Sequence, residues 1–239
     1  MTNNMKRTIL FILIMSAVTL PALSQTGKGF GGLGFYYPGY QGIMPKSLGT
    51  ILPDSYPDAG FGPLMQSGGG YVVFYNILFG AEGGDYTGGT FTKDGRQLDL
   101  TGEFGGFKLG YIVYHKEAWM IYPFAMYGTS NMDLFIHQTP DEQAFNDILN
   151  NPSLSTHLSY EASVVSLGAG FTYAVLGSRN KDISSGFMVG LEAGYQLPVS
   201  KGAWTYDNGK VLDGPEMSFQ GFFVRLAIGG GGISYRAKK

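Results

Sequence analysis

Four charged residues interrupt otherwise apolar, strand-like stretches of the sequence. Period-2 alternation places each of them on the face of its stretch that carries small residues. If the opposite faces meet lipid, an outward Arg or Lys at mid-depth would cost about 2–4 kcal/mol, and an inward charge must be paired or hydrated. The pattern predicts an inward network that plugs the interior, with a charged conduit or a proton site as the alternative. The four residues are Glu82, Lys108, Glu192 and Arg225.

A histidine and a serine could form a second chemical site. His157 and Ser159 are two positions apart, so on a strand they share a face, which could bring a base to a hydroxyl. Glu161 could extend this row. The pair resembles the His-x-Ser pair of lipid A deacylase barrels, but the rest of that pattern is absent. Ordinary rim residues are therefore favoured over catalysis.

The patterns for metals and cofactors are weak. The histidines at 115, 137 and 157 are too scattered for a convincing metal site. Asp133, Asp141 and Asp147 could bind Ca²⁺ or bridge lipopolysaccharide cations, but they lack EF-hand-like spacing, which favours a solvated loop. The glycine runs do not follow the strand-to-helix pattern of nucleotide-binding motifs. We expect no metal and no cofactor.

Eight strand-like segments between turn signals must position these residues. Their connections are short at 75–76, 115–117 and 178–183 and long at 38–63, 138–157 and 199–216. Short turns at one end, long loops at the other and an even strand number are typical of outer-membrane barrels. The sequence therefore predicts an all-β fold, an eight-stranded antiparallel up-and-down transmembrane β-barrel with periplasmic turns and extracellular loops. The segments are approximately 26–37, 64–75, 77–90, 97–114, 118–136, 158–177, 184–198 and 217–236.

Alternation also assigns the two faces of each segment. In 184–198, Phe187 and Leu191 belong to the large apolar face, and Gly190 and Glu192 to the opposite face. We expect the large apolar sets to face lipid and the small and polar sets to face the lumen. The same pattern read inside out would fit a soluble lipocalin-like barrel, which is the alternative.

The segment 97–114 changes phase. Phe104 is assigned to the outer face before Gly105-Gly106, and Phe107 to the outer face after it. A one-residue change of phase within a strand predicts a β-bulge at the two glycines.

Composition agrees with a membrane barrel. The chain of 239 residues has 38 glycines, 15% aromatic residues and no cysteine. Glycine in strands lets neighbouring side chains crowd into a narrow lumen, and aromatic residues suit the girdles at the membrane interfaces. An exported protein without disulfides must be held by its hydrogen-bond ladder and its surroundings. A net charge of −2 without a Lys/Arg cluster argues against nucleic acid as a partner.

The N-terminus has the features of a secretion signal. Lys6-Arg7 precede an apolar stretch over 8–20, which is followed by the small-x-small site Ala22-Leu23-Ser24. The apolar stretch is too short for a spanning helix, which needs about 20 residues. We predict a signal peptide over 1–24, cleaved after Ser24, and a barrel domain over 25–239.

The end of the last segment resembles the C-terminal assembly signal of outer-membrane β-barrels. Gly230, Ile233 and Tyr235 form its glycine, hydrophobic and aromatic positions, although Ile228 stands where a polar residue is usual and 236–239 follow the aromatic. With the secretion signal and eight segments, the chain resembles the small outer-membrane barrels of the OmpA, OmpX and OmpW kind. The resemblance implies a bacterial outer-membrane location, handling by the barrel-assembly machinery, contact with outer-membrane lipid and lipopolysaccharide, and a monomer.

Three functions compete. The first is a non-enzymatic barrel with a filled lumen that displays long loops for envelope integrity, adhesion or partner contact. The second is an OmpW-like conduit for small apolar molecules, with a side opening that Pro123 would permit. The third is a lipid-modifying enzyme that uses His157 and Ser159. We also expect an ordered lid in the loop 38–63 and a short helix over 141–150.

Overall fold

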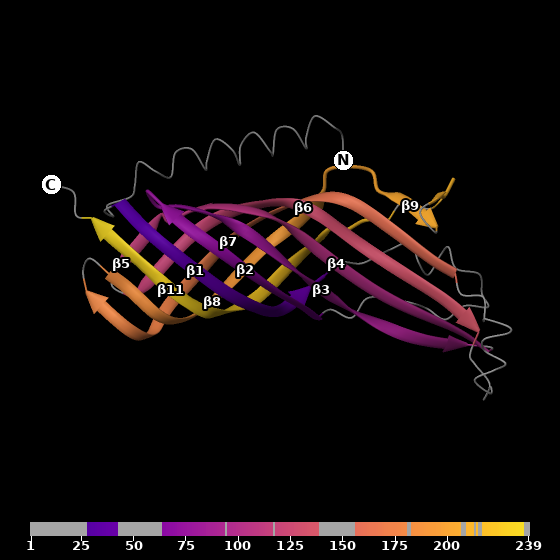
Figure 1. Ribbon diagram of the computed structural model, residues 1–239, viewed down its shortest axis with the longest axis horizontal. Coiled ribbons are helices and arrows are strands. Elements are labelled where there is room, and N and C mark those ends of the chain that lie inside the picture. The colour runs from indigo at the N-terminus through magenta and orange to yellow at the C-terminus, as the bar shows by residue number, and fades with distance from the viewer. Residues whose placement is uncertain are drawn as a thin grey trace.

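In the computed structural model eight long antiparallel strands close into one barrel (Figure 1). The described residues are 28–42, 64–93, 95–116, 118–138, 156–180, 183–206, 209–212, 214 and 217–236. The expected signal peptide and its cleavage site, the expected lid and the expected helix over 141–150 lie outside these residues. Within them, no helix is long and apolar enough to cross a membrane.

The chain runs up and down around the barrel, and the first long strand pairs with the last. The order around the closed sheet is β1-β2-β3-β4-β6-β7-β8-β11, returning to β1. The predicted fold and strand number are therefore confirmed. The barrel strands are β1 Lys28–Gln41, β2 Leu64–Phe74, β3 Ile77–Lys93, β4 Arg96–Tyr111, β6 Trp119–Gln138, β7 Thr156–Asn180, β8 Ile183–Pro198 and β11 Gly221–Arg236, and the short additions are β5 Tyr114–Lys116, β9 Ala203–Tyr206 and β10 Gly209–Lys210.

One short turn illustrates how the sequence sets the strand register. Tyr75 and Asn76 join β2 to β3 with φ angles of 53° and 67°, the left-handed conformation that two-residue hairpins need and that asparagine tolerates well. The Asn76 side chain also accepts a hydrogen bond of 2.7 Å from the backbone N–H of Gly29. The turn therefore holds the start of β1 as well as its own hairpin.

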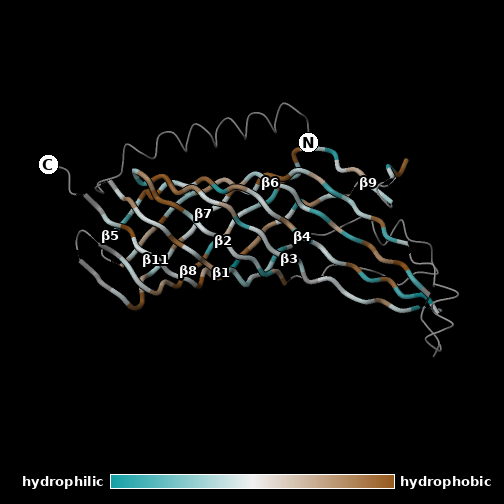
Figure 2. The backbone as a smooth tube through the Cα atoms, viewed as in Figure 1, coloured by the Kyte–Doolittle hydropathy of each residue, from teal (hydrophilic) through white to brown (hydrophobic). Residues whose placement is uncertain are grey.

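The outer surface of the barrel is apolar, and charged residues are buried inside it. Phe107 and Leu109 are 65% and 55% exposed, whereas Lys108 between them is 1% exposed. Figure 2 shows the resulting mixture of hydrophobic and hydrophilic positions along the strands. A soluble barrel would have the opposite arrangement, so the lipocalin-like alternative fails and the membrane-facing assignment stands.

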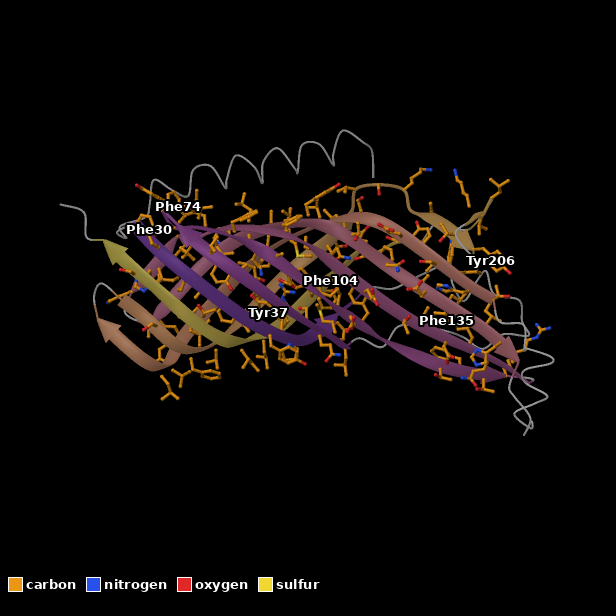
Figure 3. All side chains as sticks on the ribbon, in the orientation of Figure 1. Phe30, Tyr37, Phe74, Phe104, Phe135 and Tyr206 are labelled. Carbon is orange, nitrogen blue, oxygen red and sulfur yellow. The ribbon has the colours of Figure 1, made fainter. Side chains whose placement is uncertain are left out.

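Aromatic side chains mark both borders of the apolar belt. Phe30 and Phe74 pack edge to face at the turn end, and Tyr40 stacks on Phe222 at the loop end, with 5.5 Å between ring centroids. Figure 3 shows Phe30 and Phe74 at one end of the barrel. About ten residues separate Phe30 from Tyr40 on β1, which at about 3.3 Å per residue and a tilt of about 40° gives a belt of about 25 Å, the usual height for such barrels.

The predicted bulge at Gly105-Gly106 is wrong. Pairing of β4 with β3 and β6 is continuous through both glycines, and Phe104 points inward with 7% exposure. The register shift lies instead in β3, between Tyr86 and Gly89. The apparent change of phase has a chemical cause, because β4 leaves the apolar belt near Glu103. Beyond that point the outer face of the strand carries polar residues, and the apolar residues occupy the inner face.

Four strands continue past the rim of the barrel as a sheet, which is visible at the right-hand end of Figure 1. β1, β2, β8 and β11 end at the rim, whereas β3, β4, β6 and β7 extend beyond it. β9 pairs with the free edge of β7 opposite Leu158 to Glu161. Parts of the expected loops are therefore regular strands. We call residues 85–93, 96–103, 131–138 and 156–161 the extended sheet.

Candidate functional site

The four buried charges come from two pairs of neighbouring strands, and the two pairs lie on opposite sides of the lumen. Glu82 and Lys108 lie on β3 and β4, and Glu192 and Arg225 are direct cross-strand partners on β8 and β11. Their alternate neighbours along each strand face the lipid, so the strand period alone turns these four inward. The closed barrel then directs both pairs toward each other across its centre.

The structure brings the four residues into one network, the lumen charge cluster. The Lys108 Nζ atom lies 2.6 Å from Glu192 Oε1 and 3.4 Å from Glu82 Oε2. The Arg225 guanidinium donates to Glu192 Oε2 from Nη2 at 2.6 Å and to Glu82 Oε2 at 2.9 Å, and its Nη1 also pairs with Glu82 Oε1. Each carboxylate therefore contacts both cations, and the two positive and two negative charges cancel.

Hydroxyl and aromatic groups complete the surroundings of the cluster. The hydroxyl groups of Tyr71 and Tyr122 donate hydrogen bonds of 2.8 Å to Glu82 and Glu192 respectively. Lys108 Nζ lies 4.1 Å from the centre of the Phe124 ring, a favourable cation–π position. The charged side chains are 0–4% exposed, so the cluster is a buried, hydrogen-bonded layer that joins strands around most of the barrel.

Glycines make room for the aromatic rings of this layer. Tyr122 is the direct cross-strand partner of Gly170, and Phe223 is the partner of Gly194. A Cβ atom at Gly170 would overlap the Tyr122 ring, and one at Gly194 would lie 2.5 Å from Phe223 Cζ. The rings can lie across the neighbouring strands only because these positions have no side chain, which accounts for part of the high glycine content.

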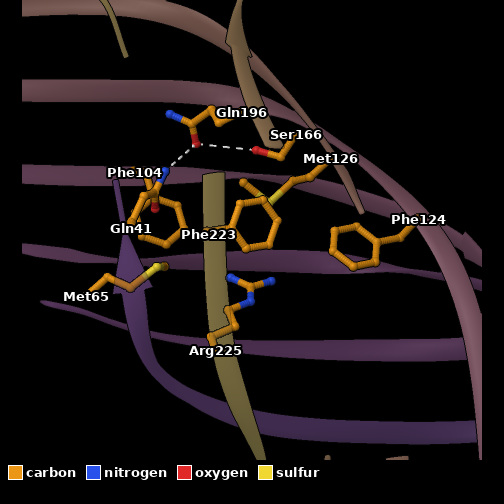
Figure 4. Close-up of a pocket in the computed structure, with 9 residues that line it drawn as sticks. All are labelled: Gln41, Met65, Phe104, Phe124, Met126, Ser166, Gln196, Phe223 and Arg225. Carbon is orange, nitrogen blue, oxygen red and sulfur yellow. Dashed lines mark hydrogen bonds between the residues drawn. The ribbon is translucent and has the colours of Figure 1, made fainter. Parts of the chain in front are cut away.

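A second polar layer lies next to the cluster, toward the loop end. Gln196 Oε1 accepts hydrogen bonds from Gln41 at 3.1 Å and from Ser166 at 3.3 Å (Figure 4). Gln196 Nε2 donates to the backbone oxygen of Phe219 at 3.0 Å. The cavity beside this layer measures about 10 Å³, close to the least space that holds one water molecule. Its lining residues are Gln41, Met65, Phe104, Phe124, Met126, Ser166, Gln196, Phe223 and Arg225.

The residues proposed for catalysis do not engage each other. His157 Nε2 lies 2.9 Å from Asp133 Oδ1, and its ring stacks on Phe135. The Ser159 hydroxyl donates instead to Asn131 Oδ1 at 2.9 Å. In this arrangement the Ser159 proton is not directed at a base, so the geometry of an activated nucleophile is missing from this face.

The extended sheet contains a second His–Asp contact, between His137 and Asp99. His137 Nε2 lies 3.7 Å from Asp99 Oδ2. A hydrogen bond from the Thr90 side chain, with smaller effects of Gln97 and His137, holds the pKa of the Asp99 carboxyl below its ordinary value of 3.8. Asp141 and Asp147 lie outside the described residues, within which no group of three or more His, Asp or Glu side chains is placed to hold a metal ion.

The residues of the expected assembly signal lie in the seam that closes the barrel. Gly230 pairs with Gly34, and Ile233 pairs with Gly31. The Ile233 side chain is 2% exposed and belongs to the buried core. Tyr235 is opposite Gly29 at the turn end. Their recognition by an assembly machinery stays a prediction.

Sequence reasoning missed the two tyrosines that complete the cluster, Tyr71 and Tyr122. Two features of the sequence point to them. Each tyrosine lies at a position whose side chain faces the lumen, and each is paired with a glycine on the next strand, Gly80 and Gly170. Reading these features requires the register between strands, which the alternation within one strand does not contain.

An apolar outer belt around a buried charged interior, on eight closed strands, defines the class. The chain has the architecture of a small transmembrane β-barrel, with eight closed strands and an apolar outer face.

Solved outer-membrane proteins have a similar arrangement of strands, although no protein-family model and no curated protein matches the chain. The attachment invasion locus protein Ail of Yersinia pestis is 12% identical, covering 89% of this chain and 100% of its own, with a TM-score of 0.36. Neisserial surface protein A is also 12% identical, covering 87% and 97%, with a TM-score of 0.37. OprG of Pseudomonas aeruginosa is 11% identical, covering 90% and 99%, with a TM-score of 0.38. At these identities the likeness concerns the fold alone.

Proposed function

We propose that this protein is a non-enzymatic outer-membrane scaffold, whose filled barrel carries its loop-end segments for envelope integrity, adhesion or partner contact. The observation that supports this best is the lumen charge cluster. Its four charged side chains balance each other and are almost completely buried. A solute on this path would have to separate ion pairs that have no bulk water to replace them, which costs several kcal/mol per ion.

The neighbouring polar layer supports the same function. Gln41, Ser166 and Gln196 bond to one another across the barrel, and the space beside them accommodates about one water molecule. Two successive filled layers leave little room for a hydrated ion. The strands β3, β4, β6 and β7 continue beyond the rim of the barrel, and such an extension suits display better than transport.

A conduit for apolar molecules would need an opening in the side wall of the barrel, and the strand pairing gives little support for one. Pro123 pairs with Ala169, and the β6–β7 ladder continues on both sides of it. The β1–β11 ladder does omit Tyr37 and Pro38. The Tyr37 ring, however, covers this point from inside, 4.3 Å from the Arg225 guanidinium carbon. A lateral path for an apolar molecule would have to displace this stacked pair.

The experiment measures permeability in two ways. The purified protein is inserted into planar bilayers to record ion conductance, and into vesicles to follow entry of a small apolar dye. We expect no steady conductance and a dye entry rate equal to that of protein-free vesicles.

A reproducible conductance that a bulky substitution at Gly194 abolishes would overturn the scaffold proposal, since Gly194 lies in the lumen against Phe223. Dye entry that depends on the protein without ion conductance would favour the apolar conduit instead.

A further inference from the structure

One long edge of the extended sheet has no neighbouring strand. β3 pairs with β4 from Gly89 to Lys93, beyond the register shift that follows Tyr86. On its other side β3 pairs with β2 only as far as Tyr86, which lies opposite Met65. In the part of the chain that the structure describes, no strand pairs with that side of residues 89–92. We call residues 89–92 of β3 the β3 edge.

The sequence explains why β2 does not continue along β3. Pro63 directly precedes β2 and has no N–H to donate to a ladder. A bulge bends the strand that carries it, and the register shift of β3 lies next to the start of β2. On its opposite side the extended sheet ends in β10, which has two residues and includes Lys210, both features that protect an edge. The β3 edge is the longer of the two and lacks such protection.

Two residues direct their backbone groups out of the β3 edge. Thr90 is directly opposite Asp99, and its side chain hydrogen-bonds to the Asp99 carboxylate. Side chains lie closest in the antiparallel pairs that exchange no backbone hydrogen bonds, so the N–H and C=O of Thr90 point away from β4. Strand alternation gives Thr92 the same direction, and both residues are exposed. They offer two donors and two acceptors to an added strand.

The side chains around the β3 edge define which strand fits there. Phe91 lies opposite the buried Leu98 and packs against the core on the inner face. The described outward positions of β3 and β4 in the extended sheet hold no Lys or Arg, because Lys93 and Arg96 occupy inner-face positions. An added strand is therefore favoured when its inward side chains are apolar and its outward side chains are basic. The outward carboxylates are Asp85, Asp99 and Glu103.

We propose that the β3 edge binds an extended peptide segment of a partner outside the cell, in which apolar and basic side chains alternate. The segment joins the sheet as an antiparallel strand and exchanges backbone hydrogen bonds with Thr90 and Thr92. Its basic side chains face Asp85 and Asp99, and an apolar side chain packs beside Phe91. The inference rests on the proposed display function and names the chemistry of its partner.

The test uses the full-length protein in nanodiscs of zwitterionic phospholipid, and the probe is a short peptide of alternating lysine and valine. Amide hydrogen exchange is followed by NMR. We expect the amides of Thr90 and Thr92 to exchange rapidly without the peptide and at least about ten-fold more slowly with it, whereas the Phe91 amide, which faces β4, is protected in both states. No slowing at a millimolar concentration of peptide would overturn the proposal. Slow exchange without peptide would also overturn it, because a second copy or another part of the chain would then cover the edge.

Two N-methylated peptides of identical composition separate strand addition from simple charge attraction. The lysines of the bound peptide lie opposite Thr90 and Thr92 and direct their N–H groups to β3, so methylation of these groups should abolish the slowing. Methylation of the valine N–H groups, which point away from β3, should retain it. Equal behaviour of the two peptides contradicts the proposal. Replacing the lysines by glutamates should weaken binding by at least about ten-fold, and equal affinity would exclude selection of a basic partner.

A matched pair of variants locates the binding site. Thr92→Pro removes an N–H from the β3 edge without removing a hydrogen bond to β4, so it should abolish the slowing at Thr90. Thr101→Ala changes an exposed outward residue of β4 and should leave binding unchanged. A retained heat-dependent shift on gels shows that each variant folds. Binding that survives Thr92→Pro contradicts the proposal. A peptide that fails to bind refutes the edge alone, since the conductance and dye experiments test the scaffold separately.

Discussion

Replacing Arg225 by Met should destabilise the barrel strongly, because Arg225 contacts both buried carboxylates of the lumen charge cluster. Its guanidinium lies 2.6 Å from Glu192 and 2.9 Å from Glu82. Without it, Lys108 alone faces two negative charges, so one carboxylate remains buried and uncompensated. Breaking a buried pair in this way costs about 3–5 kcal/mol. Water in the adjacent 10 Å³ cavity, which Arg225 lines, can lower the cost toward the smaller figure.

The assay is denaturant unfolding in lipid vesicles, followed by the fluorescence of the two tryptophans. Leu226→Met is the control, since Leu226 is the next residue on β11 and is 53% exposed on the outer face. It should change the free energy of unfolding by less than about 0.5 kcal/mol. Adding Glu82→Gln to Arg225→Met should restore part of the loss by removing the excess charge. If Arg225→Met unfolds like the parent, or if Glu82→Gln lowers stability further, the charge-balance reasoning is refuted.

Three other predictions follow from the fold. Gly170→Ala should cost about 1–3 kcal/mol of stability because its Cβ would overlap the Tyr122 ring, whereas Gly70→Ala, with nothing within 4 Å of the added Cβ, should be nearly neutral in the same unfolding assay. The low pKa of Asp99 means that its contribution to stability is present above about pH 4 and is lost as the pH falls through its folded pKa. Thr90→Val should raise that pKa in a carboxyl NMR titration, and an unchanged pKa would exclude the hydrogen bond as its main cause. The intact barrel should resist SDS until boiled and then migrate more slowly, and co-migration of boiled and unboiled samples in several detergents would contradict a closed hydrogen-bond ladder.

Alternation within single strands predicts which face a residue occupies, and here that was enough to select the inward charges. Glu192 and Arg225 follow from the small-residue faces of their strands, and the large residues beside them are exposed as expected. The contacts across the lumen, such as Lys108 with Glu192, depend on the height of each residue in the barrel. That height is set by strand tilt and stagger, which local patterns do not encode.

The loop ends of the strands are harder to predict for a different reason. The rule that large apolar residues face lipid assigns Phe104 to the outer face, but the outward residues of β4 change from apolar to polar near Glu103. The strands also run on as the extended sheet, where apolar residues such as Leu100 and Met132 are buried on the inner face. A hydropathy pattern inverts at such a border without any change in backbone geometry.

The central claim, that the first and last strands close the barrel in a defined register, can be measured by cross-linking because the chain has no cysteine of its own. Tyr36 of β1 is directly opposite Ile228 of β11, and both side chains are exposed on the outer face. Tyr36→Cys with Ile228→Cys should therefore form an intramolecular disulfide under mild oxidation, since opposed residues lie within the usual disulfide distance. Tyr36→Cys with Leu226→Cys, on the same face but two residues out of register, should form far less. Equal cross-linking of both pairs, or disulfides only between different chains, would contradict the closed barrel described above.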